Sequence, residues 1–427
     1  MIIATAGHVD HGKTKLIEAI TGVNSDRLPE EKNRGMSIDL GFAYHDLGNG
    51  VILNFIDVPG HERFINNLLS GFSNVDLGLL VIAADDGPMP QTEEHLSILQ
   101  LLQVKNCIIV LTKIDKVNQK RLDNVCCLIK KMMHKTIFSD AEIFHISNKT
   151  SQGIDNLVSH LKIIALNYHH KEVKGNFRLS VDRRFLVKGA GIVITGTVVS
   201  GEVSVGEELI HSKSGESLKI RAIHSQSKKS KNGIQGHRCS LNITGQKITI
   251  DKISRGDWIL SKNVFFVTNR LDAVLSILKN EKKIFKHWTA IHLYLGSGNV
   301  TGRIAILGSF SINPGEKKIV QLVLDKPVHA VFDDKFVIRD ISSSRTIGGG
   351  YILDPFAKKN NNTNFRSFRS ERLKLISPNS SKIVLKNLLL HYIEGIDLNY
   401  FLMSRNLTAS EFEKIIEPLD IVTELYK

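Results

Sequence analysis

The chain opens with Met1-Ile-Ile-Ala-Thr-Ala-Gly7-His8-Val9-Asp10-His11-Gly12-Lys13-Thr14, which places a short apolar run directly before the pattern G-x-x-x-x-G-K-T. This pattern is typical of a phosphate-binding loop, because glycines let the backbone wrap around phosphates and present N–H groups to them. The loop needs a strand before it and a helix after it, and residues 2–4 and 15–20 fit those two roles. We predict that the backbone from Gly7 to Gly12 surrounds phosphates, Lys13 reaches the β and γ oxygens, and Thr14 ligates Mg²⁺. The alternative is a chance glycine turn before a helix.

A second motif places a carboxylate and a glycine after an apolar segment. Residues 51–56 are mostly apolar and lead to Asp57, which is followed by Val58-Pro59-Gly60-His61-Glu62. Asp57 is suited to the shell around Mg²⁺. Gly60 has no side chain, so its N–H can approach a γ-phosphate where any side chain would intrude.

Two more motifs fit a purine base. The apolar residues 107–111 are followed by Thr112-Lys113-Ile114-Asp115. The carboxylate of Asp115 can accept two hydrogen bonds from the Watson–Crick edge of guanine, whereas adenine presents an acceptor there. Residues 142–146 lead into Ser147-Asn148-Lys149, a candidate base-clamping loop. Each motif alone fits an ordinary turn, but the four in this order favour a GTP site.

The pattern of the chain changes after the polar residues 167–176. Residues 1–170 alternate apolar strands, such as 75–84, with helical segments, such as 91–103, which predicts a parallel sheet with helices on both faces. The polar segment 23–41 is predicted to be a mobile switch. Residues 175–262 and 266–354 show short strands punctuated by glycine, which predicts two β-barrels. In the second of these barrels, strands are expected at 290–295, 319–324 and 335–339.

The C-terminal part of the chain is predicted to be helical. A basic, Asn-rich linker is expected between about residues 358 and 372. Helices are expected at 380–394, at 398–404 and from Ala409 onwards. They suit one partial winged-helix-like module over residues 372–427; the alternative is a generic helical tail that packs on the barrels. The predicted fold is therefore multidomain: an α/β P-loop GTPase domain, two β-barrels and a small helical module.

Composition limits the class of protein. The 427 residues suffice for roughly two to four domains. The four cysteines show no paired or metal-binding spacing, which favours a reducing cytoplasm. No signal peptide is visible, and no apolar run reaches the roughly 18 residues of a membrane span. A net charge of +13 favours a polyanionic partner such as RNA, although a Lys-rich background accounts for it equally well.

The motifs together resemble those of the translational GTPases: G-H-V-D-H-G-K-T, R-G-M-S at 34–37, D-V-P-G-H-E at 57–62 and T-K-I-D at 112–115. Residues 26–41, D-R-L-P-E-E-K-N-R-G-M-S-I-D-L-G, resemble the bacterial selenocysteine-specific translation elongation factors, as does a phosphate loop that begins almost at the first methionine. The resemblance covers about residues 1–350. It implies a monomeric cytoplasmic GTPase that uses GTP, GDP and Mg²⁺ and delivers selenocysteinyl-tRNA to the ribosome at UGA codons.

The resemblance also assigns roles to residues. It implies that His61 orients the attacking water, that Thr14 and Ser37 ligate Mg²⁺ directly, and that Asp57 lies behind them. Serine stands at position 37 where this superfamily usually has threonine. Threonine at position 112 replaces the usual asparagine, as it also does in selenocysteine factors, and Ser147-Asn148 replaces Ser-Ala, where backbone N–H groups contact the base.

The family's aminoacyl pocket lies in its first barrel and is built from basic residues. Selenocysteine is an anionic selenolate at neutral pH, so cationic donors would distinguish it from serine and cysteine. The resemblance assigns this pocket to Arg183 in V-D-R-R-F and Arg238 in G-H-R-C-S-L-N-I. Arg184 is expected on the other face of its strand. The alternative for each is an ordinary surface arginine.

The resemblance thins after about residue 350. Bacterial members carry several winged-helix modules at the C-terminus, and the last ones grip an mRNA hairpin. This chain has room for about one module, which leaves the binding of the hairpin by this chain in doubt. A natural truncation, a fragment of a longer chain and delegation to another molecule all fit.

Two rival functions compete with this interpretation. One is another tRNA-carrying GTPase, such as an archaeal-type initiator-tRNA factor, against which residues 26–41 argue. The other is a shortened, non-catalytic RNA-binding relict that holds its nucleotide as a structural ligand. His61 and the intact phosphate loop argue against decay, whereas the short tail argues for it.

Overall fold

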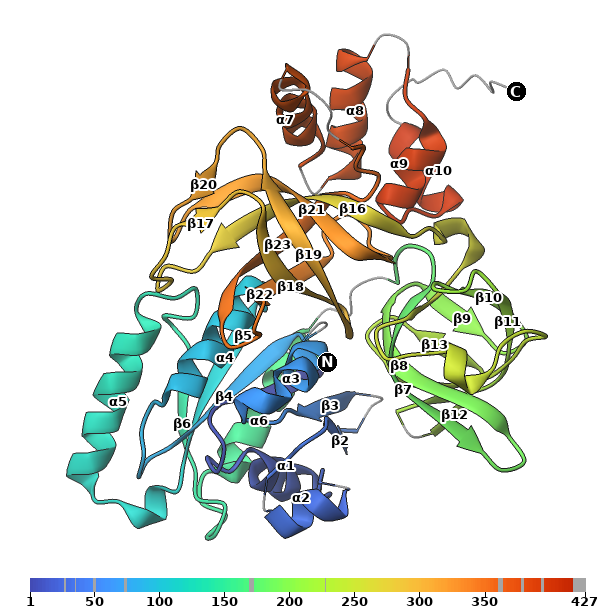
Figure 1. Cartoon of the computed structure of the whole chain (residues 1–427). Coiled ribbons are helices and arrows are strands. Elements are labelled where there is room, and N and C mark those ends of the chain that lie inside the picture. Colours follow the sequence, from blue (N-terminus) through green and yellow to red (C-terminus); the bar gives the residue numbers. More distant parts are fainter. Residues whose placement is uncertain are drawn as a thin grey trace. The chain divides into compact units, whose positions relative to one another are not determined.

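The structure is a computed structural model that describes residues 1–26, 28–34, 36–48, 51–72, 75–168, 173–226, 228–359, 364–377, 380–392 and 395–417. It forms two compact units, Met1–Lys171 and Glu172–Lys427 (Figure 1). Gly35 of the R-G-M-S motif lies outside the described residues, as does Glu394 at the expected end of a C-terminal helix.

Unit 1 contains a six-stranded sheet with the order β2-β3-β1-β4-β5-β6 (Figure 1). All neighbours from β3 to β6 are parallel, as predicted. Strand β2 is antiparallel to β3, so the prediction of a wholly parallel sheet is wrong at this edge. The reason is the short connection over residues 47–51, because parallel strands need a crossover of about a dozen residues or more. The strands are β1 Ile2–Ala6, β2 Gly41–Asp46, β3 Ile52–Asp57, β4 Leu77–Ala83, β5 Asn106–Thr112 and β6 Ile143–His145.

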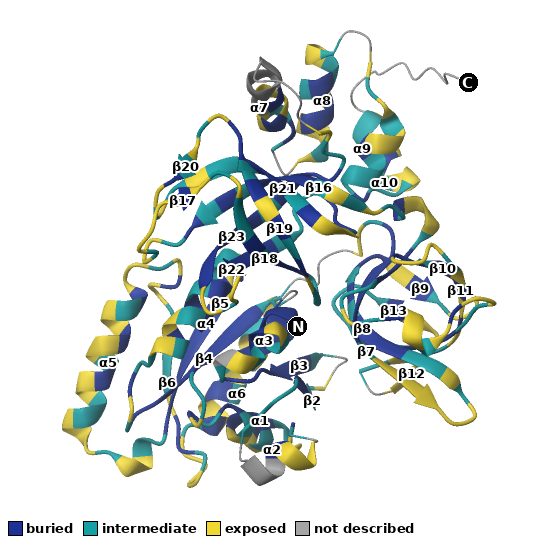
Figure 2. Cartoon of the chain, in the orientation of Figure 1, coloured by how far each residue is buried: buried dark blue, intermediate teal, exposed yellow. Residues whose placement is uncertain are grey.

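Helices cover both faces of this sheet, as predicted. Leu16 of α1 and Leu157 of α6 share one core with Ile3 of β1. On the opposite face, Gly78 of β4 lies against Leu99 of α4, where a Cβ would come within 2.9 Å of Leu99. Strand β4 is buried along its whole length (Figure 2). The helices are α1 Lys13–Thr21, α3 Ile65–Phe72, α4 Pro90–Leu101, α5 Gln119–Met133 and α6 Ile154–Asn167, with short 3₁₀ turns η1 Glu62–Phe64 and η2 Ile114–Lys116.

The predicted switch segment contains a helix that the sequence pattern did not indicate. This helix, α2, spans Pro29–Arg34. Proline at the first helical position has its φ already set for a helix, and Glu30 and Glu31 in the first turn complement the helix dipole. The segment is therefore partly ordered in this conformation.

Unit 2 begins with a six-stranded barrel. Strand β10 pairs with both β15 and β11, which closes the order β10-β15-β7-β8-β14-β11, and β12 extends β11 as a hairpin. The inward residues form one apolar core that includes Leu179, Ile194 and Leu241. The elements are β7 Arg178–Val187, β8 Gly191–Ser200, β9 Glu202–Ser204, β10 Glu208–His211, β11 Ser217–Ser225, β12 Lys228–Ser230, β13 Asn232–Ile234, β14 Arg238–Thr244, η3 Ile250–Lys252, β15 Trp258–Leu260 and η4 Lys262–Val264.

A second closed barrel follows, with the order β16-β21-β19-β18-β22-β23. Three predicted strands, at 290–295, 319–324 and 335–339, fall inside β18, β21 and β22 and are confirmed. Its core is separate from that of the first barrel. The strands are β16 Thr268–Ile277, β17 Phe285–Lys286, β18 Thr289–Leu295, β19 Gly298–Ile306, β20 Ser311–Ile312, β21 Lys317–Val328, β22 Lys335–Asp340 and β23 Thr346–Asp354.

A buried polar network joins the two barrels. Arg178 of β7 donates to the Asp334 carboxylate (3.1 Å) and to Nε2 of His329 (2.9 Å), and it lies 4.7 Å from the Trp258 ring centre. The other nitrogen of His329 donates to the carbonyl of Phe266 (3.1 Å). Removing one partner of such a buried pair typically costs about 3–5 kcal/mol, so this network holds the barrels together.

The C-terminal helices are α7 Asn364–Ile376, α8 Ser381–His391, α9 Leu398–Ser404 and α10 Ala409–Ile416. They share an apolar cluster with the outer face of the second barrel, which fits the alternative of a tail packed on the barrels. No strand follows Asp354 in the described residues. None of the described helices has the length and apolarity needed to span a membrane.

Helix α7 corrects the predicted linker, because residues 364–372 are helical. Arg369, Leu373 and Ile376 are buried and recur at helical spacing. An arginine at a buried position made this pattern hard to recognise in the sequence; its Nε donates to the buried Asp272 carboxylate (2.7 Å). Asn406, before α10, fixes the other end of the tail to the first barrel, where its side-chain oxygen accepts from the Asn176 N–H (3.0 Å).

Candidate functional site

The phosphate loop connects β1 to α1 in a tight, left-handed path. Gly7 has φ 128°, and a Cβ there would lie 2.1 Å from the Val81 carbonyl oxygen. Gly12 has φ 88° at the start of α1. The buried Lys13 donates to the carbonyls of Gly7 (3.1 Å) and His8 (2.7 Å), so its ammonium lies inside the loop. Burial lowers the pKa of Lys13 to about 8, although the carboxylates of Asp57, Asp10 and Asp26 oppose this shift.

Helix α4 supports the loop through two side chains that the sequence analysis missed. The buried His95 accepts a hydrogen bond from the Gly7 N–H at Nδ1 (2.9 Å), and Gln91 accepts one from the Val9 N–H (3.2 Å). The sequence feature that could have indicated them is a pair of polar residues, Gln91 and His95, four positions apart near the start of a helix that packs on the sheet. These contacts fix the first part of the loop.

Two histidines in this region must stay neutral in the folded protein. Burial lowers the pKa of His11 to about 4, assisted by His8 and Lys13, and it holds the pKa of His95 well below 6.5 for the same reasons. Both His11 ring nitrogens are buried, and the nearby Val81 backbone and the Asp86 carboxylate, 3.6 Å away, only partly offset the effect of burial on the pKa of His11. Protonation would therefore place unsolvated charge beside Lys13.

We expect this arrangement to make unit 1 sensitive to acid. Below the unfolded value of 6.5, the unfolded state binds protons at His11 and His95 that the folded state rejects, so stability is complete above that pH and falls below it. For each histidine the slope approaches about 1.4 kcal/mol per pH unit as the pH falls below 6.5. Urea unfolding of the intact chain across this range measures it. His95→Gln should remove about half of this slope, and an unchanged slope would contradict the assignment.

The predicted metal ligands come together at the end of β3. The Thr14 hydroxyl donates to the Asp57 carboxylate (2.7 Å) and lies 3.0 Å from the Ser37 hydroxyl. Ser37 also donates to Asp26 (2.8 Å), a residue that the sequence analysis did not assign to the site. The buried Asp57 further accepts from Ser25 (2.7 Å).

This donor set fits Mg²⁺. It consists of hydroxyl and carboxylate oxygens, the hard ligands that this ion prefers. Burial, together with the charges of Asp57 and Glu31, raises the pKa of Asp26 against the effect of its Ser37 hydrogen bond, so a cation would relieve concentrated negative charge. Among the described residues, no group of three His, Cys, Asp or Glu side chains forms an alternative metal site.

Glu31 fastens the switch segment around this cluster. Its buried carboxylate accepts backbone N–H groups from Leu28 (2.8 Å), Ile38 (3.0 Å) and Asp39 (3.0 Å). Asn67 of α3 donates to the Ile38 carbonyl (2.7 Å) and so ties the same segment to the helix after His61. Glu31 therefore joins both sides of the segment that carries Ser37. In the sequence, Glu31 was only one of several charged residues in this segment, so the pattern did not indicate its role.

We expect Glu31→Gln to weaken GTP binding by about 10-fold or more and to leave GDP binding unchanged. A hydrogen bond to a charged group contributes about 1.5–3 kcal/mol, and an amide cannot accept all three N–H groups at once. Dissociation rates of both nucleotides measure the effect. Glu30→Gln, on the exposed side of α2, is the matched control. An equal loss of affinity for GTP and for GDP would contradict a role of Glu31 that is specific to the GTP-binding conformation of the switch.

Gly60 lies against the phosphate loop, and His61 follows it directly in the chain. A Cβ on Gly60 would lie 2.6 Å from both the Lys13 Nζ and the Val9 nitrogen, so only glycine fits this approach. His61 is half-buried, and its Nδ1 accepts a hydrogen bond from the Arg63 N–H (3.2 Å). The neutral ring therefore carries its proton on Nε2. This position suits the predicted orienting role.

The base site is assembled from the ends of β5 and β6. Asp115 is exposed, and one of its oxygens accepts from the buried Ser147 hydroxyl (2.6 Å), which holds the pKa of Asp115 below its usual value. Thr112 donates to the His11 carbonyl (2.7 Å), so its hydroxyl already links the base motif to the phosphate loop. The side-chain amide of Asn148 donates to the Gly12 carbonyl (3.4 Å).

The two lysines of these motifs differ in their surroundings. Lys113 has a left-handed backbone, and its Nζ lies 3.3 Å from Asp85 and 3.6 Å from Asp86. Lys149 is exposed. Asp10, in the phosphate loop, is also exposed and left-handed, with φ 62°.

The candidate aminoacyl pocket contains an acid as well as the two predicted arginines. Arg238 of β14 donates to both oxygens of the buried Asp182 (2.9 Å each) and to the Thr195 hydroxyl (3.0 Å). Burial would raise the pKa of Asp182, but Arg238, Thr195 and Arg183 together hold it below its usual value. Asp182 lies in a β-bulge between Val181 and Arg183.

Arg183 and Arg184 separate as predicted for neighbours on a strand. Arg183 is half-buried, and its charge acts on Asp182. Arg184 instead donates to the carbonyl of Ile250 in η3 (2.6 Å). The sequence analysis missed Asp182 and Thr195; the available signal was an acid directly before the two arginines.

Comparisons with known proteins agree with this geometry. Residues 1–166 match the family described as "Elongation factor Tu GTP binding domain", and residues 272–359 match "Selenocysteine-specific elongation factor, beta-barrel domain". The selenocysteine-specific elongation factor of Escherichia coli K12 is 41% identical over 353 residues, which is 83% of this chain and 55% of that protein. The chain thus spans about half the length of this relative.

Two further relatives are covered more fully. The selenocysteine-specific elongation factor of Methanocaldococcus jannaschii is 30% identical over 74% of this chain and 68% of its own length. The crystal structure of a bacterial selenocysteine-specific elongation factor superposes with a TM-score of 0.82 at 31% identity, over 96% of this chain and 67% of that one. With its GTP-binding domain, two barrels and short C-terminal helices, this chain belongs to the family of selenocysteine-specific elongation factors.

Proposed function

We propose that this chain binds GTP with Mg²⁺, carries selenocysteinyl-tRNA to the ribosome in the cytoplasm as a monomer, and there hydrolyses GTP. The observation that carries the proposal is the meeting of Ser37 from the switch with Thr14 and Asp57. A metal-binding loop whose conformation depends on a switch is what a nucleotide-controlled carrier requires.

Each part of the nucleotide has a set of residues suited to it. The N–H groups of the loop from Gly7 to Gly12 that His95 and Gln91 leave unused, together with the Lys13 ammonium, hold phosphates, while Thr14 and Ser37 hold Mg²⁺ with Asp57 behind them. Asp115, oriented by Ser147, accepts from guanine, with Thr112, Lys113 and Lys149 around the base. When bound, GTP supplies the phosphoryl group whose transfer to water is the reaction. The residues of the chain position and stabilise, and His61 orients the water.

The switch couples the nucleotide to the cargo. Ser37 can reach Mg²⁺ only while Glu31 and Asn67 hold the segment in the conformation seen here. Loss of the γ-phosphate removes one reason for Ser37 to stay there, so we propose that the segment opens after hydrolysis and releases the tRNA.

The pocket of the first barrel has a charge suited to a selenolate. Arg183 and Arg238 carry two positive charges and Asp182 carries one negative charge, which leaves one net positive charge in a partly buried place. At neutral pH a serine hydroxyl or a cysteine thiol is uncharged, so that positive charge stabilises it less than it stabilises an anionic selenolate. Asp182 also fixes the Arg238 guanidinium in one orientation.

Protection of the aminoacyl ester tests the nucleotide-controlled carrier. Spontaneous hydrolysis of selenocysteinyl-tRNA is followed with the chain loaded with GDP or with a non-hydrolysable GTP analogue. We expect protection only with the analogue, and we expect Ser37→Ala to abolish this difference. Equal protection by both nucleotides, or none by either, would refute the proposal.

A further inference from the structure

Exposed aromatic side chains gather on the second barrel. Trp288 is 46% exposed and Phe310 is 77% exposed. His287 lies between them, with its ring centre 6.1 Å from each of theirs. Exposed apolar side chains grouped in one place mark interaction sites. None of the roles proposed above uses this group.

The backbone holds Trp288 in a conformation that bulky residues avoid, with φ 67°. Neighbours fix this conformation: the Trp288 N–H donates to the Ile304 carbonyl (2.7 Å), and the Trp288 carbonyl accepts from Arg303 (3.2 Å). A ring that is about half exposed contributes little to the core. Strain kept at such a position points to a role in binding.

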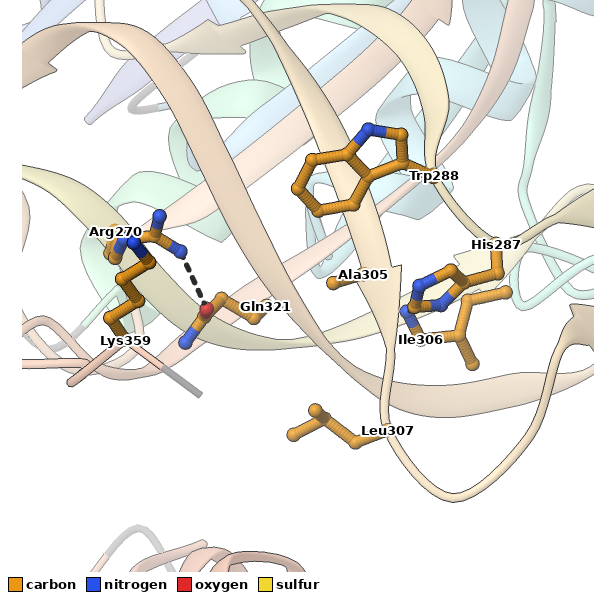
Figure 3. A pocket seen from close by; sticks show the side chains of 8 residues that line it. All are labelled: Arg270, His287, Trp288, Ala305, Ile306, Leu307, Gln321 and Lys359. Atoms are coloured by element: carbon orange, nitrogen blue, oxygen red, sulfur yellow. Dashed lines mark hydrogen bonds between the residues drawn. The ribbon is translucent and has the colours of Figure 1, made fainter. Parts of the chain in front are cut away.

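His287 and Trp288 line a cavity of about 140 Å³ (Figure 3). Arg270 and Lys359 add two positive charges to its wall, and Arg270 is anchored on the Gln321 side chain (3.0 Å). The described residues that line the cavity include no carboxylate. A cavity of about 150 Å³ accommodates a benzene-sized ring, so this one suits a planar ring that carries an anionic group.

We propose that this surface, the aromatic ledge (His287, Trp288, Phe310, Arg270 and Lys359), binds an unpaired nucleotide of RNA. The base stacks on Trp288, and its phosphate lies between Arg270 and Lys359. Stacking accepts every base, so the ledge adds affinity without reading sequence. An acidic peptide would satisfy the two cations but would leave the rings without a partner. The inference rests on the proposed function only in expecting an RNA partner.

Tryptophan fluorescence tests the ledge in the intact chain. The chain has two tryptophans, and the other one, Trp258, is only 4% exposed. Quenching by a ligand therefore reports chiefly on Trp288. The probe is a short single-stranded oligoadenylate, compared with a ribose–phosphate strand of the same length that lacks bases. We expect saturable quenching by the first and none by the second.

Substitutions separate stacking from charge. Trp288→Gly removes the ring and suits the positive φ, so it should weaken oligoadenylate binding by about 5- to 150-fold, the range for loss of one stacked base, without lowering the melting temperature. Because this variant lacks the fluorescent reporter, its binding is compared with that of the unsubstituted chain by the anisotropy of a dye-labelled oligoadenylate. Arg270→Gln and Lys359→Gln should each reduce the salt dependence of binding by about 0.7 in logarithmic slope. Phe185→Ala, which removes another exposed aromatic ring, is the matched control and should change nothing.

Equal binding of the two strands, or unchanged binding by Trp288→Gly, would overturn the proposal. Either outcome would leave the proposed cargo untouched, because neither aminoacyl-tRNA nor ribosomes enter this experiment. Conversely, a chain that failed to protect selenocysteinyl-tRNA could still show the quenching.

Discussion

Replacing His61 with alanine is expected to lower GTP turnover on the ribosome by about 10²- to 10⁴-fold, the usual contribution of a positioned proton-transfer or water-orienting side chain. GTP binding should stay unchanged, because the loop, the Mg²⁺ ligands and Asp115 are separate from this ring. His61 directly follows Gly60, where a Cβ would lie 2.6 Å from the Lys13 Nζ and the Val9 nitrogen, so we expect the imidazole to reach the water beside the γ-phosphate. Single-turnover hydrolysis with saturating ribosomes measures the effect.

A matched control for this prediction is His45. It lies on β2, is also half-buried and has no role assigned in the nucleotide site, so His45→Ala should retain turnover. If His61→Ala also retained ribosome-stimulated turnover, another group would have to orient the water. The relict interpretation predicts a different result, namely no stimulated turnover in the unsubstituted chain.

Asp115→Asn is expected to weaken GTP binding by about 10²- to 10⁴-fold, since two hydrogen bonds to a charged acceptor contribute about 1.5–3 kcal/mol each. The same substitution should favour xanthosine triphosphate, because xanthine offers one donor and one acceptor where guanine offers two donors, and an amide matches that pattern. Competition binding with the two nucleotides measures the switch.

The control for Asp115 is a carboxylate outside the site. Asp123 on α5 is exposed and accepts from Gln119, so Asp123→Asn should leave nucleotide preference unchanged. If Asp115→Asn lost GTP without gaining xanthosine triphosphate, the carboxylate would serve the fold of the η2 turn instead of the base. Retained GTP binding would place the guanine elsewhere.

Motifs with strict local geometry could be predicted from the sequence. Gly7 and Gly12 adopt positive φ, and Gly60 has no room for a side chain, so these positions carry their structural reason in their identity. The apolar strands of unit 1 and of the second barrel were also predictable, because alternation and glycine punctuation are local. The roles of the site residues remain predictions.

Residues whose role depends on distant partners could not be predicted. Asp182, Glu31 and His95 are polar residues that become significant only when Arg238, the two ends of the switch and Gly7 reach them. Arg369 is similar: it looked like part of a linker because nothing local indicates that Asp272 would bury it. The antiparallel edge strand β2 was hidden because it begins where the charged segment 23–41, predicted to be a mobile loop, ends.

The most direct test of the account is the affinity of the GTP-loaded chain for one tRNA that carries either selenocysteine or serine. We predict strong preference for the selenocysteinyl form, and we predict that Arg183→Ala and Arg238→Ala each remove most of it while GTP binding persists. Equal affinity for the two forms, or binding of an initiator tRNA in preference to both, would contradict the assignment of this cargo.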